Sequence, residues 1–142
     1  MPEETAVPDL AGLEQRERPA PTGDPADLEL IHHRAMLAAM AAVNVKAEEV
    51  RILDMHEVVT YTDYLVLCTG RNARLTKRIA EEIGFKLKGE AGVLPTGTEG
   101  TAAGDWILLD YLDFVVHIFT PEAREFYRLD VLWKQAAVET VE

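Results

Sequence analysis

The strongest constraint on the fold of this chain is the stretch from Gly104 to Tyr127, in which two apolar runs flank a short acidic junction. The runs cover residues 106–109 and 114–119, and they are rich in the Trp, Ile, Val and Phe that favour strands. The junction at 110–113 is short enough for a hairpin. Thr120 then supplies a helix N-cap and Pro121 suits the first helical position. The stretch therefore predicts strand, turn, strand and helix, with the helix running to about Ala136.

The rest of the chain supplies further helices and strands. Asp24 and Asn72 are good N-caps for a first helix and a middle helix, and the middle helix carries an apolar stripe at four-residue steps from Leu75 to Leu87. Strands are expected at residues 50–55 and 64–69, with a short extended segment at 95–100. This order predicts one α/β domain with a mixed sheet of about five strands and helices packed on its faces.

Domain limits follow from composition. Residues 1–25 hold five of the seven prolines and more acidic than basic residues, which predicts a disordered acidic tail, although a linear docking segment is an alternative. The domain then spans 26–137, and 138–142 form a short C-terminal tail. A chain of 142 residues suits a single domain with a useful core.

The net charge and the targeting signals limit which partners and which cellular location are expected. A net charge of −11 argues against nucleic acid as the main partner and suits either a basic protein or simple solubility. Cys68 lies in an apolar run and is expected to be a buried, unreactive thiol. No run approaches the roughly 18 apolar residues that span a bilayer, so no membrane is expected. Neither a secretory nor a transit peptide is apparent, and the cytoplasm is the expected location.

Several segments in the right order resemble the Iojap/RsfS family, the ribosomal silencing factors. Besides the stretch at 104–127, they are residues 51–54, 62–64, 95–100 and 132–133, and the resemblance covers about 28–133. It implies a fold similar to that of nucleotidyltransferases, without a cofactor or an enzymatic activity. Members of the family bind the large ribosomal subunit through its protein number fourteen and so block joining of the small subunit. The resemblance also implies that the protein forms a homodimer when it is not bound to the ribosome.

The resemblance also implies a partner-binding site around the predicted hairpin. One departure concerns Leu112, because the family usually has glycine there and leucine tolerates positive φ poorly. The hairpin tip is therefore expected to differ. The matching positions are Trp106, Leu108, Asp110, Tyr111 and Asp113, with Glu99 and Asp63 as further members.

Strand alternation leaves the exposure of these residues open. Trp106, Leu108 and Asp110 share one face of their strand, and Ile107 and Leu109 point to the other. One face must cover the core. The second face either presents an aromatic or aliphatic anchor rimmed by carboxylates, as in a protein-binding patch, or lies under helices as well.

Two other functions deserve comparison. A nucleotidyltransferase-like enzyme could use Asp110 and Asp113 for a metal, yet the chain has no Asp-x-Asp and Gly70 is followed by Arg71. We therefore expect no catalytic residue, no metal site and no cofactor, and His117 is expected to be structural. An RNA-binding adaptor could use a basic cluster where the middle helix begins, either as a contact to ribosomal RNA or as an ordinary solvated face. Its members are Arg71, Arg74, Lys77 and Arg78.

Overall fold

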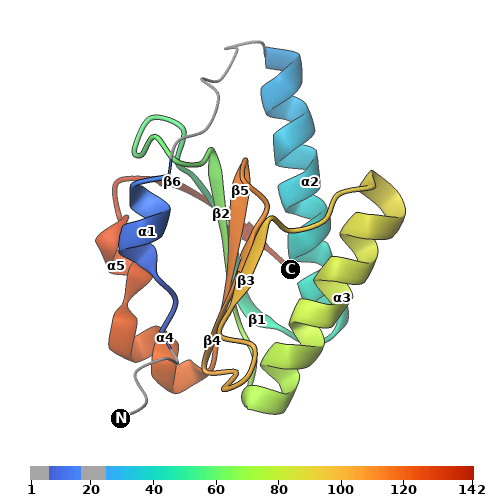
Figure 1. Ribbon diagram of the computed structural model, residues 1–142, viewed down its shortest axis with the longest axis vertical. Helices are drawn as coiled ribbons and strands as arrows, with labels where there is room; N and C mark the ends of the chain where they lie inside the picture. Colours follow the sequence, from blue (N-terminus) through green and yellow to red (C-terminus); the bar gives the residue numbers. More distant parts are fainter. Residues whose placement is uncertain (1–6, 17–24) are drawn as a thin grey trace.

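The computed structural model describes residues 7–16 and 25–142, and these form three layers (Figure 1). A six-stranded sheet is the middle layer, with α2 and α3 on one face and α1, α4 and α5 on the other. The helices are α1 (Leu10–Glu14), α2 (Pro25–Asn44), α3 (Ala73–Ala91), α4 (Pro121–Tyr127) and α5 (Leu129–Leu132). The strands are β1 (Glu48–Asp54), β2 (Tyr64–Thr69), β3 (Gly97–Glu99), β4 (Trp106–Asp110), β5 (Phe114–Phe119) and β6 (Ala137–Val141).

The sheet is mixed, with the strand order β3-β4-β5-β2-β1-β6. Only β2 and β5 pair in parallel, and every other neighbouring pair is antiparallel. The predicted hairpin is β4–β5, in which Trp106 faces Phe119 and Asp110 faces Val115. The α/β class and the single mixed sheet are therefore confirmed, with six strands instead of about five.

The sixth strand corrects the prediction for the C-terminus. A single helix was expected from Pro121 to about Ala136, but Arg128 adopts the left-handed conformation at φ 54° and separates α4 from the short α5. The chain then turns back, and β6 pairs with β1 in the segment that was predicted as a tail. Residues 137–141 alternate in polarity only weakly and are mostly exposed, so their strand depends on pairing with a distant edge.

The N-terminal segment also differs from the prediction of a disordered tail. Within residues 7–16, Asp9 caps α1 by accepting a hydrogen bond from the Gly12 amide at 2.9 Å. Leu13 is only 7% exposed and belongs to the apolar cluster on that side of the sheet. The remainder of the predicted tail, residues 1–6 and 17–24, lies outside the described residues.

Each face of the sheet has its own apolar cluster. On the α2 and α3 side, fully buried alanines of α2 and the predicted stripe of α3 pack against β-strand residues such as Ile107 and Cys68. Burial raises the pKa of the Cys68 thiol to about 12, as expected for an unreactive cysteine. On the other side, Trp106 and Leu108 pack with residues of α1 and α5. In the described part of the chain, no helix is long and apolar enough to cross a membrane.

Candidate partner-binding surface

The tip of the β4–β5 hairpin is held by several hydrogen bonds around Leu112. This residue adopts φ 74°, the conformation for which the family resemblance led us to expect glycine. Its amide donates to the Asp110 carboxylate at 2.8 Å, and its carbonyl accepts from the Thr62 hydroxyl at 3.0 Å. These bonds offset the cost of a positive φ in leucine. The tip thus keeps a left-handed residue without the glycine.

The parallel pairing of β2 with β5 brings three predicted carboxylates to one end of the sheet. Tyr64 pairs with Phe114, so the residues that precede each strand are neighbours. The Asp63 amide donates to the Asp113 carbonyl at 3.0 Å, and Asp110 ends the adjacent β4. Asp63 is 1% exposed, whereas Asp113 is partly exposed. The hairpin tip therefore gathers Asp110 and Asp113 with Asp63, which is distant from both in the sequence.

Trp106 is a core residue of this region. Its side chain is 2% exposed, and its ring N–H donates to Nδ1 of His117 at 2.9 Å. The ring also lies 4.7 Å from that of Tyr127 in α4 and 5.3 Å from that of Phe119, measured between centroids. Burial lowers the pKa of His117 to about 3, so the imidazole is neutral and accepts this hydrogen bond at neutral pH. His117 is structural, as predicted.

Both faces of β4 are buried, which answers the question that strand alternation left open. Leu108 is 2% exposed beside Trp106, and Tyr111 is 7% exposed on the opposite side, where its ring stacks on Phe114 at 4.9 Å. Burial raises the pKa of Tyr111 to about 12. None of these three side chains is an exposed anchor in this structure. Among the predicted partner-binding residues, Glu99 is exposed, and Asp110 and Asp113 are partly exposed.

The N-terminal segment contributes contacts of two residues, Arg16 and Asp9, that were not predicted from the sequence. Arg16 forms an ion pair with Asp110 and donates to the carbonyl of Leu112 at 2.9 Å. The amide of Asp9 donates to the carboxylate of Glu99 at 2.8 Å. These residues were missed because they lie in a segment whose composition predicts disorder. Only Leu10 and Leu13, spaced for one helical face, hinted at packing.

Comparison with known proteins identifies the family. The family model described as "Ribosomal silencing factor during starvation" matches residues 29–142. The ribosomal silencing factor RsfS of Chromobacterium violaceum is 34% identical over 103 residues, which cover 72% of this chain and 84% of that protein. The chain belongs to the ribosomal silencing factor family. The chloroplastic protein Iojap of Zea mays is 32% identical over 105 residues, covering 72% of this chain and 44% of that protein.

A solved structure supports the same assignment. The crystal structure of a protein from Chromobacterium violaceum superposes with a TM-score of 0.70 and 34% identity, covering 73% of this chain and 86% of that chain. The resemblance drawn from the sequence and the fold class are thereby confirmed. Ribosomal silencing factors are non-enzymatic, in agreement with the prediction that this chain is not an enzyme.

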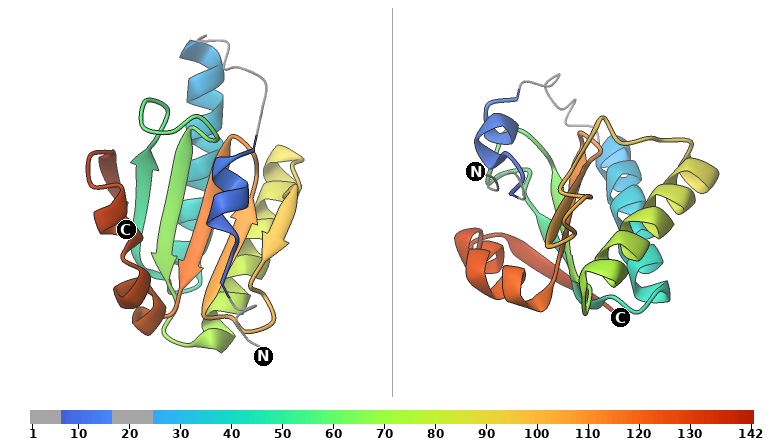
Figure 2. Two further views of the ribbon diagram at one scale, coloured as in Figure 1. Left: turned by 60° about the vertical axis from the view of Figure 1, so that its left-hand side comes forward. Right: turned by 60° about the horizontal axis from the view of Figure 1, so that its bottom comes forward.

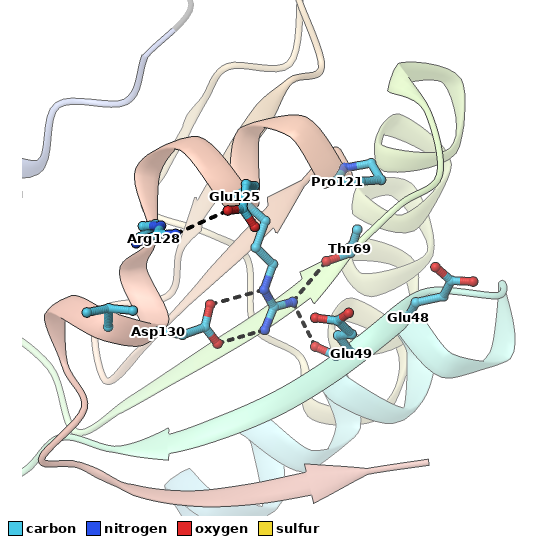
Figure 3. A pocket seen from close by; sticks show the side chains of 9 residues that line it. Glu48, Glu49, Thr69, Pro121, Glu125, Arg128 and Asp130 are labelled. Carbon is cyan, nitrogen blue, oxygen red and sulfur yellow. Dashed lines mark hydrogen bonds and ion pairs between the residues drawn. The ribbon is translucent and has the colours of Figure 1, made fainter.

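A polar hollow among the described residues lies between α4, α5 and the edge of β1 and β2 (Figure 3). At its centre, the guanidinium of Arg124 binds both oxygens of Asp130, at 3.1 and 2.8 Å. The same group donates to the Glu49 carbonyl at 2.8 Å and to the Thr69 hydroxyl at 2.9 Å. Nearly all its donors are used within the chain, so Arg124 joins α4 to β1 and β2 and does not await a ligand.

The structure bears on the two alternative functions, a metal-dependent enzyme and an RNA-binding adaptor. Residues 7–16 and 25–142 contain no group of three or more His, Cys, Asp or Glu side chains placed to hold a metal ion. The basic cluster lies at the start of α3, where Arg78 forms an ion pair with Glu82 at 3.5 Å. Arg71 shares a surface hollow with Asp105 and Glu122. These acidic neighbours weaken the attraction of Arg71 for a phosphate.

Proposed function

We propose that this protein binds the large ribosomal subunit through its protein number fourteen and represses translation by blocking association with the small subunit. The observation that carries the proposal is the family match, which extends over residues 29–142 and includes the entire β4–β5 hairpin. Steric exclusion needs no cofactor and no reaction. The site of action is the compartment that holds the ribosomes, for which we propose the cytoplasm.

The acidic hairpin end supports this partner by its charge. Glu99, Asp110 and Asp113 lie on β3, at the end of β4 and in the hairpin turn, and the chain carries a net charge of −11. Ribosomal proteins are generally basic, so complementary charge favours encounter and orientation. The proposed contact set consists of these three carboxylates together with Trp106, Leu108, Tyr111 and Asp63, whose side chains are buried in this structure.

Sedimentation of the purified protein with large subunits, followed by addition of small subunits, tests the proposal. We expect co-sedimentation with the large subunit and fewer joined ribosomes. Asp113→Lys should weaken binding by about ten-fold, since it places a cation where a basic partner docks. Glu29→Lys makes the same charge change on the exposed side of α2 and serves as the control. Absence of binding by the folded protein would remove the proposal.

A minor contact to ribosomal RNA is proposed for the basic cluster at the start of α3, which consists of Arg71, Arg74, Lys77 and Arg78. Its contribution shows in the salt dependence of the same binding reaction. Reversing the charge of Arg71 and Arg74 should reduce the slope of affinity against salt by about one for each phosphate that these side chains neutralise. An unchanged slope would leave these side chains as a solvated surface.

A homodimer is proposed for the free protein. Large apolar side chains are exposed on α2 and α3, where Met40 is 53% and Phe85 is 73% exposed. Such side chains favour association when they gather into one patch. Sedimentation equilibrium should give twice the mass of the chain, and Phe85→Glu should reduce the measured mass to that of a monomer.

A further inference from the structure

The segment 7–16 covers part of the sheet face on which Trp106 and Leu108 of the proposed contact set lie. In Figure 2 (left), α1 lies in front of β5 and β4, on the side opposite α2 and α3. The family match begins at residue 29, so this segment lies outside the region shared with the family. It lies N-terminal to the matched domain and occupies one of its faces.

Both ends of the segment are bound to residues of the proposed contact set. At one end, the Asp9 amide donates to the Glu99 carboxylate at 2.8 Å. At the other, the Arg16 guanidinium pairs with Asp110 and donates to the carbonyls of Tyr61 and Leu112. The side chains of Arg16 and Asp110 retain only 16% and 14% of their exposure. These groups at the hairpin are thus largely withdrawn from solvent by the segment.

The middle of the segment covers apolar surface. Leu13 is 7% exposed, Pro8 is buried, and Leu10 packs against the same cluster. That cluster includes Trp106 and Leu108, which the family resemblance places at the partner contact. Removal of Leu13 would expose an apolar surface rimmed by carboxylates, which is the composition expected of a protein-binding patch.

Arg16 of the segment makes the kind of contact with the acidic hairpin that a basic partner would make. The hairpin is acidic, and Arg16 places a guanidinium on its carboxylate and on two backbone carbonyls. A basic ribosomal protein that approaches the same carboxylate needs the position that Arg16 occupies. The two bound states therefore exclude one another.

The segment is built to be displaced. Its helix has five residues, far fewer than an isolated helix needs to persist in water, so its order depends on its contacts with the sheet. Leu13 is the one buried side chain within α1. Short elements with few buried contacts open at much lower free energy than the core of a domain does. Opening of α1 leaves the layers formed by α2, α3 and the sheet intact.

We propose that residues 7–16 form an intramolecular cover on the ribosome-binding face and that the large subunit must displace it in order to bind. This inference rests on the proposed function. The cover lowers the apparent affinity by the fraction of molecules in which the face is open. It therefore sets the concentration at which the protein acts, without altering the contact surface itself.

Binding of large subunits by three variants tests the cover. Deletion of residues 1–16 and the substitution Arg16→Ala should both tighten binding, by up to about ten-fold for a cover that is closed nine-tenths of the time. Arg16→Ala also makes the chain more acidic. Lys88→Ala also removes one positive charge, but from the exposed side of α3, across the sheet from the cover. It should leave the affinity for large subunits nearly unchanged. Thermal unfolding confirms that each variant is folded.

The outcomes separate the two proposals. Tighter binding by the deletion and by Arg16→Ala, with loss of amide-exchange protection at Gly12 and Leu13 in the complex, supports the cover. Equal or weaker binding by both variants overturns the cover and retains the proposed function, since α1 is then neutral or part of the contact. Absence of binding by every folded variant overturns the proposed function and the cover with it.

Discussion

At the scale of single residues, Trp106 connects the two strands of the hairpin through its side chain as well as its backbone. Its ring N–H has His117 as acceptor, and its ring fills the space between Phe119 and Tyr127. We expect Trp106→Ala to lower the free energy of unfolding by about 3–5 kcal/mol, the usual cost of removing a buried aromatic ring. Urea denaturation at neutral pH measures the loss.

The same substitution also separates a packing role from a binding role. Trp106→Phe retains most of the apolar volume and loses the hydrogen bond to His117, and should cost clearly less. If Trp106→Ala abolished ribosome binding while the unfolding midpoint stayed near that of the parent chain, Trp106 would act in binding and not in packing.

At the scale of elements, Arg124 holds α4 against the sheet. The helix has seven residues, and the Arg124 guanidinium connects it to β1, β2 and Asp130. Arg124→Ala leaves the Thr69 hydroxyl and the Glu49 carbonyl without this donor, and should destabilise the protein by about 2–3 kcal/mol. Arg124→Lys should recover only part of this loss, because an ammonium cannot reproduce the planar fork.

The control for this prediction is Lys134→Ala, which removes an exposed cation after α5. It should change stability by less than about 0.5 kcal/mol, as is usual for surface substitutions. Chemical denaturation of the three variants gives the comparison. Equal midpoints for Arg124→Ala and Lys134→Ala would mean that α4 is held by its apolar contacts alone.

At the scale of the whole molecule, the burial of His117 makes the free energy of unfolding depend on pH. Its pKa is about 3 in the folded protein and near 6.5 when unfolded, so the unfolded state binds more protons between these values. The contribution of the neutral His117 to the free energy of unfolding is complete above pH 6.5. It is lost as the pH falls toward 3, at up to about 1.4 kcal/mol per pH unit. Denaturation midpoints at neutral pH and at two acidic values within this range measure the slope.

Replacement of the imidazole isolates this contribution. His117→Asn provides an acceptor for the Trp106 ring without a titrating group, and its stability should fall less steeply over the same pH range. Parallel pH profiles of the two proteins would show that other groups, and not His117, govern acid unfolding. The comparison concerns slopes, because the substitution itself lowers stability at every pH.

The sequence by itself determined the elements whose signals are local. Asn72 and Thr120 are N-caps that accept hydrogen bonds from the third following amide, and the apolar stripe of α3 lies in the core. The β4–β5 hairpin formed as the apolar runs and the short junction predicted. Each of these features depends on neighbours within a few residues, and chemistry at that range is written directly in the residue order.

The tertiary structure alone decided what depends on distant partners. β6 exists because β1 offers an unpaired edge, and α1 exists because the sheet face accepts Leu13 and Arg16. Leu112 keeps a positive φ because the side chains of Thr62, Asp110 and Arg16 bind its backbone. The burial of both faces of β4 follows from the helices packed on each side of the sheet. Apart from the spacing of Leu10 and Leu13 in α1, these features leave no periodic trace in the sequence, since the stabilising groups lie up to about a hundred residues away.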